Sequence, residues 1–170
     1  AVIECSKKFG DQPKGSELFL GKKEIYAARS KLPSKVLSTI ERIAGRIEDF
    51  ASAQLKSISS TEISVPGGAV GQEISPVERA GCYAPAGRFP LPSSILMTAV
   101  TARAAGVKEV IVASPNPSPI TIAAASQAKV DGLLCAGGAH AIAAMAYGAG
   151  PFGPCDVVVG PGNRFVTAAK

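Results

Sequence analysis

Two glycine-rich segments in the second half of the sequence have the residue types that a ligand-binding loop needs. Gly137-Gly138 and Gly160-Pro161-Gly162-Asn163 each follow a short apolar run and precede a segment typical of a helix. Glycine permits backbone conformations that other residues avoid, and N–H groups at a helix start can bind an anionic or polar ligand. A strand-to-helix turn that simply requires glycine explains the same pattern. The sequence contains neither a complete G-x-G-x-x-G nor a Gly-Lys-Ser motif, so the usual dinucleotide fingerprint is absent.

His140 and Asn163 are the polar side chains that these two segments would present to a ligand. His140 is the single histidine of the chain. It could act as a general base, bind a ligand by a hydrogen bond or be structural, and the neighbouring sequence supplies no carboxylate to orient it. Asn163 could offer its carboxamide to a ligand or cap the helix that begins after it. The residue types alone leave these alternatives open.

Short apolar strands alternate with helices from Ser93 onward. Strands are expected within 108–115, 132–136 and 156–160, and helices within 93–106, from Ser118-Pro119 and within 137–148. Continuous apolar strands separated by helices are typical of a parallel sheet that is covered on both faces. The pattern predicts the α/β class, with a Rossmann-like parallel-sheet domain.

In such sheets a ligand binds beyond the carboxyl ends of the strands, in the loops that lead into the helices. Three segments qualify here, at 113–119, 136–141 and 160–165. We expect all three to open on the same edge of the sheet.

A long amphipathic helix is predicted between Leu32 and Ile58, with Ser34 as its N-cap. Its apolar residues recur at intervals of three and four, and they are Val36, Ile40, Ile43, Ile47, Phe50 and Ala51. We therefore expect residues 1–75 to form an incomplete first domain, a partial and mainly helical segment of a second α/β domain. Residues 76–170 would form the Rossmann-like domain, truncated at its carboxyl end.

Turn residues at 65–71 separate this helical region from the second half of the chain. Short β-rich pieces are expected around 70–74 and 79–84. The loop after the second piece contains several prolines and glycines, and its prolines make it stiff.

The composition argues against several classes of protein. Hydrophobic residues make up 46% of the 170 residues, and no apolar stretch approaches the roughly 20 residues that span a bilayer. The net charge of +5 is concentrated in the first 60 residues, and aromatic residues are only 5%, which does not favour nucleic-acid binding. We expect neither a nucleic-acid partner nor a membrane partner.

The four cysteines are widely spaced, at Cys5, Cys82, Cys135 and Cys155. With one histidine and no Cys-x-x-Cys, this spacing supports neither a zinc site nor a disulfide framework. Reduced, mostly buried thiols and a cytoplasmic location are therefore expected. The sequence begins at Ala1 without a visible targeting segment, which is expected of a processed chain or of a piece of a longer protein.

Four blocks, in this order and at this spacing, make the sequence resemble histidinol dehydrogenase. They are PVERAGCYAPAG at 76–87, LPSSILMTAVTARAAGVKEVIVASP at 91–115, GGAHAIAAMAYG at 137–148 and VGPGNRFVTAAK at 159–170. Looser agreement continues through Gly10-Asp11, EIYAA at 24–28 and RIEDFASAQ at 46–54. The resemblance spans the chain but covers less than half of a full-length family member.

The resemblance implies an NAD-dependent, zinc-requiring enzyme of histidine biosynthesis. Such an enzyme oxidises L-histidinol to L-histidine in two successive hydride transfers, and it is a homodimer whose site includes groups from both subunits. The nicotinamide cofactor performs the oxidation, while protein and metal hold the alcohol and move protons.

The resemblance also implies roles for individual residues. Tyr83 and Asn163 stand at the positions of residues that contact NAD, and Ser93 matches a serine near the histidinol site. His140 stands where the family usually has a glutamine that touches NAD. An imidazole replaces one of the hydrogen bonds of a carboxamide but not its whole pattern, which puts the affinity for the cofactor in question.

Two further departures from the family pattern are Ala86, which replaces a glycine, and Ala51-Ser52, where a His-Glu pair often occurs. Alanine is harmless at a former glycine only if the turn has a negative φ.

The family's zinc ligands and its Glu-His acid/base pair are expected beyond the end of this sequence. No catalytic residue and no metal ligand are therefore expected within the chain, which alone should lack dehydrogenase activity. Two hypotheses result: a portion of a histidinol dehydrogenase, or a shortened, non-catalytic paralogue that keeps a nucleotide-binding or interaction module.

Overall fold

The computed structural model describes residues 1–11, 17–87 and 89–170. Its helices are α1 Val2–Phe9, α2 Lys22–Arg29, α3 Ser34–Lys56, α4 Pro92–Ile95, α5 Thr101–Ala104, α6 Pro119–Gln127, α7 Gly138–Tyr147 and α8 Arg164–Ala169, with a π-helical turn η1 Leu96–Val100. Its strands are β1 Phe19–Gly21, β2 Thr61–Val65, β3 Gly68–Gln72, β4 Arg79–Tyr83, β5 Glu109–Ala113, β6 Gly132–Leu134 and β7 Val157–Val159.

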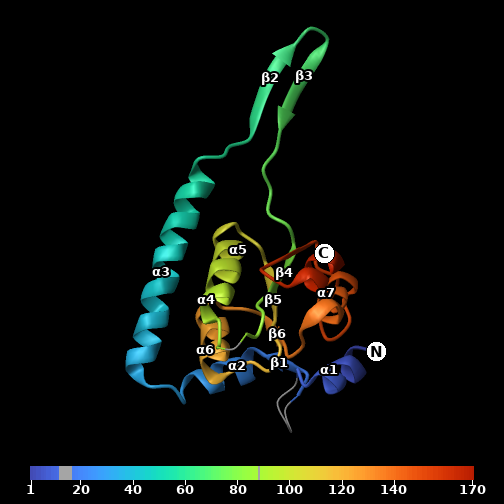
Figure 1. Cartoon of the computed structure of the whole chain (residues 1–170). Coiled ribbons are helices and arrows are strands. Elements are labelled where there is room, and N and C mark those ends of the chain that lie inside the picture. Colours follow the sequence, from blue (N-terminus) through green and yellow to red (C-terminus); the bar gives the residue numbers. More distant parts are fainter. Residues whose placement is uncertain (12–16, 88) are drawn as a thin grey trace.

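A mostly parallel sheet forms the centre of the molecule (Figure 1). Within the described residues it has five strands in the order β1-β6-β5-β4-β7, in which β4 to β7 are parallel and β1 is antiparallel to β6. The predicted α/β class and parallel strands are therefore confirmed. Strand β1 was not predicted, because three residues are too few to show a period.

The chain reverses its direction across the sheet after β6. From β4 it moves outward to β5 and β6, and it then returns to the free side of β4 to form β7. This is the strand order of one half of a doubly wound fold, in which a ligand crevice opens where the order reverses. By this rule a ligand is expected at the carboxyl ends of β4 and β7.

The two faces of the sheet have separate cores because side chains alternate along each strand. On β5, Val110 and Val112 belong to the core beneath α2, α3, α4, η1, α5 and α6. Ile111 and Ala113 point to the opposite core, beneath α1, α7 and α8. The covering helices explain why the strand is apolar at almost every position.

Helix α3 packs on one face of this sheet rather than forming a core of its own. Ile40, Ala44 and Ala51 are buried, but Ile43 is 37% exposed and Phe50 is 67% exposed, so part of the predicted apolar stripe faces outward. The predicted N-cap was wrong by one residue: Pro33 is the N-cap, and the helix already includes Ser34. Strand β1 pairs with β6, and α2 and α3 contribute to the same core as the second half of the chain. A domain boundary at residue 75 stays a prediction.

Of the predicted turn at 65–71, only Pro66 and Gly67 form the tip of a hairpin, because Val65 ends β2 and residues 68–71 belong to β3. Strand β2 pairs with β3, every residue of both strands is exposed, and Figure 1 shows the hairpin projecting away from the sheet. The expected piece at 70–74 begins earlier, at Gly68, and its partner β2 was not predicted. None of the described helices combines the length and apolar character needed to cross a bilayer.

The helix predicted at 93–106 is divided into α4, η1 and α5. It begins at Pro92, one residue before the expected Ser93, with Leu91 as N-cap. Gly106 follows its end with a φ of 88°, as expected of a glycine that stops a helix. The start of α6 was predicted correctly, because Ser118 accepts a hydrogen bond from the Thr121 N–H and Pro119 takes the first helical position.

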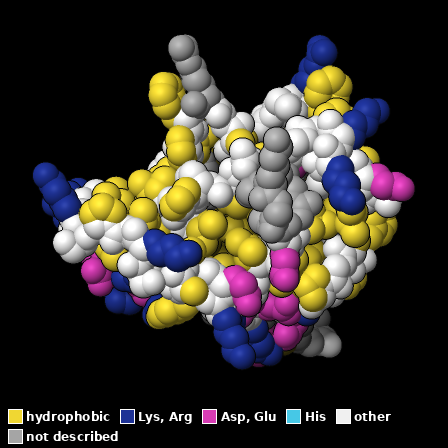
Figure 2. Space-filling model, turned by 90° about the horizontal axis from the view of Figure 1, so that it is seen from below, with side chains coloured by type: hydrophobic (Ala, Val, Ile, Leu, Met, Phe, Trp, Pro, Cys, Tyr) yellow, Lys and Arg dark blue, Asp and Glu magenta, His cyan; other side chains and the backbone are white. Residues whose placement is uncertain are grey.

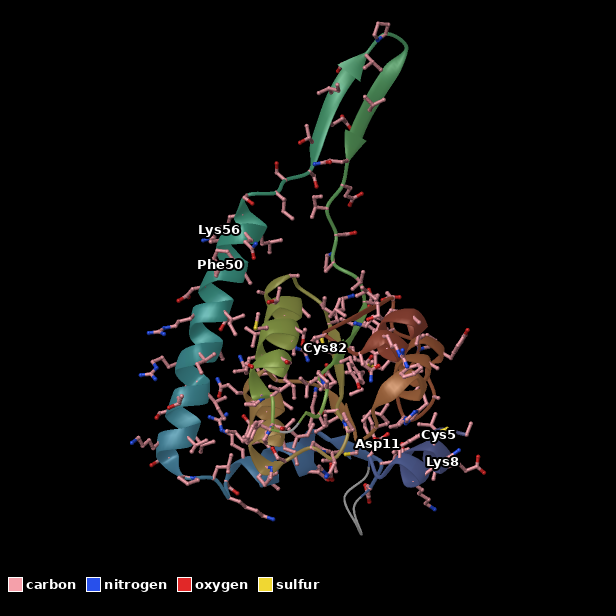
Figure 3. The ribbon with its side chains drawn as sticks, viewed as in Figure 1. Cys5, Lys8, Asp11, Phe50, Lys56 and Cys82 are labelled. Carbon is pink, nitrogen blue, oxygen red and sulfur yellow. The ribbon has the colours of Figure 1, made fainter. Side chains whose placement is uncertain are left out.

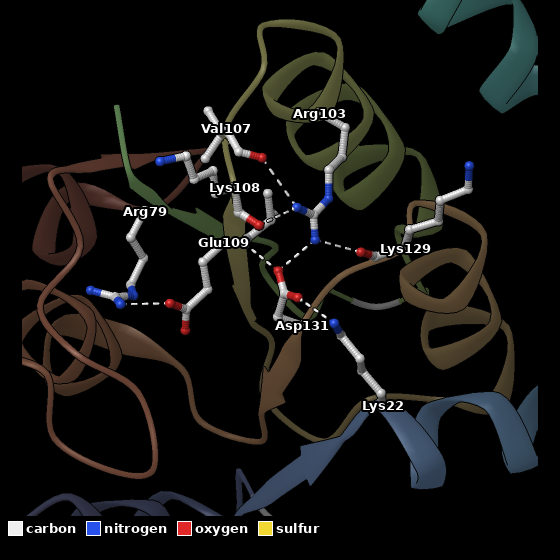
Figure 4. A network of polar contacts seen from close by, with 9 residues as sticks. Lys22, Arg79, Arg103, Val107, Lys108, Glu109, Lys129 and Asp131 are labelled. Carbon is white, nitrogen blue, oxygen red and sulfur yellow. Dashed lines mark hydrogen bonds and ion pairs between the residues drawn. The ribbon is translucent and has the colours of Figure 1, made fainter. Parts of the chain in front are cut away.

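A partly buried polar network ties α5 to the sheet near the amino ends of the strands (Figure 4). The Arg103 guanidinium donates to Asp131 Oδ2 at 2.5 Å, and Lys22 Nζ lies 2.7 Å from Asp131 Oδ1. Burial raises the pKa of Asp131, but hydrogen bonds from Lys22, the Val110 N–H and Arg103 outweigh it and hold that pKa below its ordinary value. The charged carboxylate is therefore the form that the fold stabilises.

We predict that Asp131→Asn lowers the free energy of unfolding at pH 7 by about 1–3 kcal/mol, because two charge-assisted hydrogen bonds weaken. Because the pKa of Asp131 is lower in the folded state, its carboxylate stabilises the protein at pH values above the ordinary pKa of 3.8. This stabilisation is lost as the pH falls through the folded-state pKa. Urea unfolding between pH 7 and pH 2 should therefore show a smaller acid loss in the variant. The control is Asp49→Asn on the exposed side of α3. Equal acid sensitivity of wild type and D131N would contradict the role of this carboxylate.

Candidate functional site

The loops after β4, β5, β6 and β7 all open at the carboxyl edge of the sheet, because these strands are parallel. The expectation that the segments at 113–119, 136–141 and 160–165 share one edge is thereby confirmed. Figure 2 shows this end of the molecule, with apolar side chains gathered near its middle and Lys and Arg side chains toward its periphery.

Tyr83 is the last residue of β4 and lies at the centre of this edge. It is 4% exposed, and its Oη accepts a hydrogen bond from the Gly138 N–H at 3.0 Å. Burial raises the pKa of Tyr83, the Gly138 N–H lowers it and the nearby Asp11 charge raises it, with a net rise. The hydroxyl is therefore protonated at neutral pH, and its O–H can donate to a ligand.

Gly160, directly after β7, packs against the backbone of Tyr83. Its φ is 123°, and a β-carbon at this position would lie 2.0 Å from the Tyr83 carbonyl oxygen. Only glycine fits both the torsion and the space. This contact brings the 160–163 turn beside the end of β4.

Asp11 supplies the orienting carboxylate that the sequence around His140 lacks. Its Oδ2 lies 2.9 Å from His140 Nε2 and accepts a hydrogen bond from the Gly137 N–H at 3.1 Å. Figure 3 shows Asp11 at the lower end of the molecule, next to the amino-terminal segment. The sequence around His140 contains no carboxylate that could orient the imidazole, as expected. The fold supplies one from Asp11, which lies 129 residues away in the sequence.

Asn163 is the N-cap of α8. Its Oδ1 accepts hydrogen bonds from the N–H groups of Phe165 and Val166, at 3.0 and 3.1 Å. Of the two alternatives for this residue, the cap is observed, and contact with a ligand stays a prediction. The two are compatible, because capping uses the side-chain oxygen and leaves the side-chain NH₂ to donate.

The structure does not tie Ser93 to this group of side chains. Ser93 is exposed at the second position of α4, and in the described part of the chain its hydroxyl has no hydrogen bond. Its proximity to a substrate stays a prediction. Ala86 is not among the described residues with positive φ, so its replacement of a glycine introduces no backbone strain.

Two hollows lie near the sheet edges. One of about 240 Å³ is at the carboxyl edge, between the loops after β4 and β5, and its lining includes Ala86, Phe89, Ser114 and Ser118. The other, of about 800 Å³, is at the amino edge and is mainly apolar. Because polar groups converge on Tyr83 and not on this larger groove, we place the candidate site at the carboxyl edge.

The described residues do not fit a zinc ion. Among them, no group of three or more His, Cys, Asp and Glu side chains is arranged to hold a metal. Burial raises the pKa of Cys82, Cys135 and Cys155 to about 11 each, which disfavours the thiolate that a metal or a nucleophilic reaction requires. The four thiols are free, and the expectation that they are mostly buried holds for Cys82 and Cys135, whereas Cys5 and Cys155 are only partly buried.

Comparisons with known proteins agree over the whole chain. The family model described as histidinol dehydrogenase matches residues 1–170. The histidinol dehydrogenase of Methanococcus maripaludis is 45% identical over 174 residues, covering 100% of this chain and 41% of the relative. That of Neisseria gonorrhoeae is 39% identical over 177 residues, with the same two shares.

A solved structure of a histidinol dehydrogenase has a similar fold. The crystal structure of histidinol dehydrogenase from Elizabethkingia anophelis matches with a TM-score of 0.85 and 31% identity, over 99% of this chain and 40% of that chain. The chain therefore spans about two fifths of the length of the relatives that it matches.

We predict that Gly160→Ala lowers the free energy of unfolding by at least about 2 kcal/mol, because the β-carbon would overlap the Tyr83 carbonyl at a positive φ. The matched control is Gly45→Ala in α3, where no heavy atom lies within 4 Å of the added carbon. That variant should gain up to about 1 kcal/mol from helix propensity. Chemical denaturation of both variants checks the prediction, and a G160A chain as stable as wild type would show that the contact is absent.

Proposed function

The chain belongs to the histidinol dehydrogenase family, and we propose that it contributes the NAD-binding part of an NAD-dependent, zinc-requiring enzyme that oxidises L-histidinol to L-histidine in two hydride transfers. The family is one of oxidoreductases, and its membership implies a place in histidine biosynthesis. The histidinol substrate and a homodimeric assembly are part of the same proposal.

The convergence of two loops on Tyr83 is the observation that carries the NAD part of the proposal. The Gly138 N–H, from the loop after β6, reaches the Tyr83 hydroxyl, and Gly160, from the loop after β7, packs on the Tyr83 carbonyl. The strand order reverses between β4 and β7, and the carboxyl ends of the strands at such a point are the usual place for a nucleotide in this type of sheet. These features fit a cofactor that is held by neutral hydrogen bonds rather than by a Gly-rich fingerprint.

Within this site each residue would have a separate task. Tyr83 offers a buried O–H donor, His140 an imidazole at the start of α7, and Asn163 the NH₂ of its carboxamide. NAD, when bound, supplies the hydride acceptor. The protein groups would orient the cofactor and exclude water from it.

No step of the zinc chemistry is derived from this chain, since its described residues do not fit the metal. The zinc ligands and the acid/base pair of the proposed enzyme would come from sequence outside these 170 residues. Ser93 is proposed as a residue near the substrate, on the family resemblance alone.

The role of Asn163 can be separated from its cap by Asn163→Ser. Serine caps a helix about as well as asparagine, so the free energy of unfolding should change by less than about 0.5 kcal/mol. Serine lacks the carboxamide NH₂, and NAD affinity measured by isothermal titration should therefore fall on the order of fivefold to tenfold. Unchanged NAD affinity would show that Asn163 acts only as a helix cap. A wild-type chain that does not bind NAD at millimolar concentration would contradict the proposed cofactor site.

A further inference from the structure

We infer that Asp11 is a positioning residue for the candidate site: it holds His140 as the Nε2–H tautomer, so that Nδ1 is kept as a hydrogen-bond acceptor for the cofactor. The inference deepens the proposed function and rests on it for the identity of the ligand. The tautomer itself depends only on the contacts of this chain.

The Asp11 carboxylate determines which imidazole nitrogen carries the hydrogen. Asp11 Oδ2 lies 2.9 Å from His140 Nε2, within hydrogen-bond distance. An ionised carboxylate can only accept, so the nitrogen that faces it must carry the hydrogen. A neutral imidazole has one donor and one acceptor, and the partner of one nitrogen therefore fixes the role of the other. With Nε2 donating to Asp11, Nδ1 is the acceptor.

The amino-terminal segment also restrains the imidazole ring. The side chains of His140 and Asp11 are only 16% and 13% exposed. Phe9 stacks on the imidazole, with the ring centroids 6.0 Å apart and the planes at 19°. Low exposure strengthens the hydrogen bond, and stacking opposes rotation of the ring. Both contacts favour this orientation of the ring.

The acceptor nitrogen lies in the same turn as the backbone donor to Tyr83. A β-carbon at Gly138 would lie 3.6 Å from His140 Nδ1, so this nitrogen sits beside the α-carbon of Gly138. The N–H of the same glycine donates to the Tyr83 hydroxyl. No hydrogen bond to Nδ1 is found within 1–11, 17–87 and 89–170. Nδ1 is therefore an acceptor beside Gly138, the residue that donates to Tyr83, and it has no protein donor among those residues.

Asp11 is itself anchored by its backbone. Its N–H donates to the Ser6 carbonyl at 3.0 Å, its carbonyl accepts from the Asn116 N–H, and Gly10 turns the chain with a φ of 69°. Asp11 thus joins α1, the loop after β5 and the start of α7. Its carboxylate is placed by backbone contacts on two sides, as a positioning group requires.

The hydrogen-bond pattern has a consequence for position 140. Since the Nε2–H of His140 donates to Asp11, only the acceptor Nδ1 is left for the cofactor. The cofactor must therefore donate an N–H or O–H to Nδ1. A glutamine could divide its carboxamide in the same way, with the NH₂ toward Asp11 and the oxygen toward the ligand. Histidine and glutamine would then be equivalent at this position, and a side chain without an acceptor would not be.

The tautomer can be measured without any ligand. His140 is the only histidine, so the chain labelled with ¹⁵N-histidine gives one imidazole in a long-range ¹H–¹⁵N correlation spectrum. For the neutral imidazole we expect the Nε2–H form alone in the wild type, and a mixture of both tautomers in Asp11→Ala. Asp49→Ala, an exposed aspartate on α3, should match the wild type. A predominant Nδ1–H form in the wild-type chain, or an unchanged tautomer in folded D11A, would overturn the inference.

NAD titration then tests the functional consequence. The D11A variant should bind NAD on the order of threefold to tenfold more weakly, His140→Gln should stay within about threefold of wild type, and His140→Leu should lose affinity as D11A does. H140Q binding as poorly as H140L would overturn the acceptor role. An Nε2–H tautomer in a wild-type chain that does not bind NAD would contradict the proposed function but support the positioning of His140 by Asp11.

Discussion

The packing of Gly160 on the carbonyl of Tyr83 is the contact on which the candidate site depends. It allows β7 to return to the free side of β4 and to end level with it, which places two loops from distant parts of the sequence at one point. Any larger side chain at residue 160 would push the 160–163 turn away from Tyr83. The strand order and the position of Asn163 are both compatible with this close approach.

A second constraint comes from the first eleven residues. The amino-terminal segment packs on α7, and Asp11 reaches both the N–H of Gly137, just before that helix, and the imidazole of His140. The site is thus completed from both ends of the sequence, by groups whose sequence separation exceeds 120 residues. A site assembled in this way depends on the whole described fold, and not on residues 76–170 alone.

Local signals in the sequence predicted much of the second half, and they failed where a contact is long-range. Ser118-Pro119 marks a helix start by its own chemistry, so the beginning of α6 was recognised without knowledge of its neighbours. Strand β1 was missed because its three residues pair only with a distant strand. The exposure of Phe50 was missed because helical periodicity defines a stripe but not which part of it finds a partner. In the same way Asp11 could not be predicted as the partner of His140, because no spacing rule connects residues so far apart.

NAD binding at the carboxyl edge between β4 and β7 is the hypothesis that unites the glycine contact, the Asp11–His140 pair and the Asn163 cap. An amide ¹H–¹⁵N spectrum of the labelled chain during an NAD titration would locate the bound cofactor. We expect shifts for Tyr83, for 137–140 and for 160–163, with no shift for Val157 and Met97, which line the apolar groove at the opposite edge. Shifts confined to that groove, or no shifts at saturating NAD, would contradict the hypothesis.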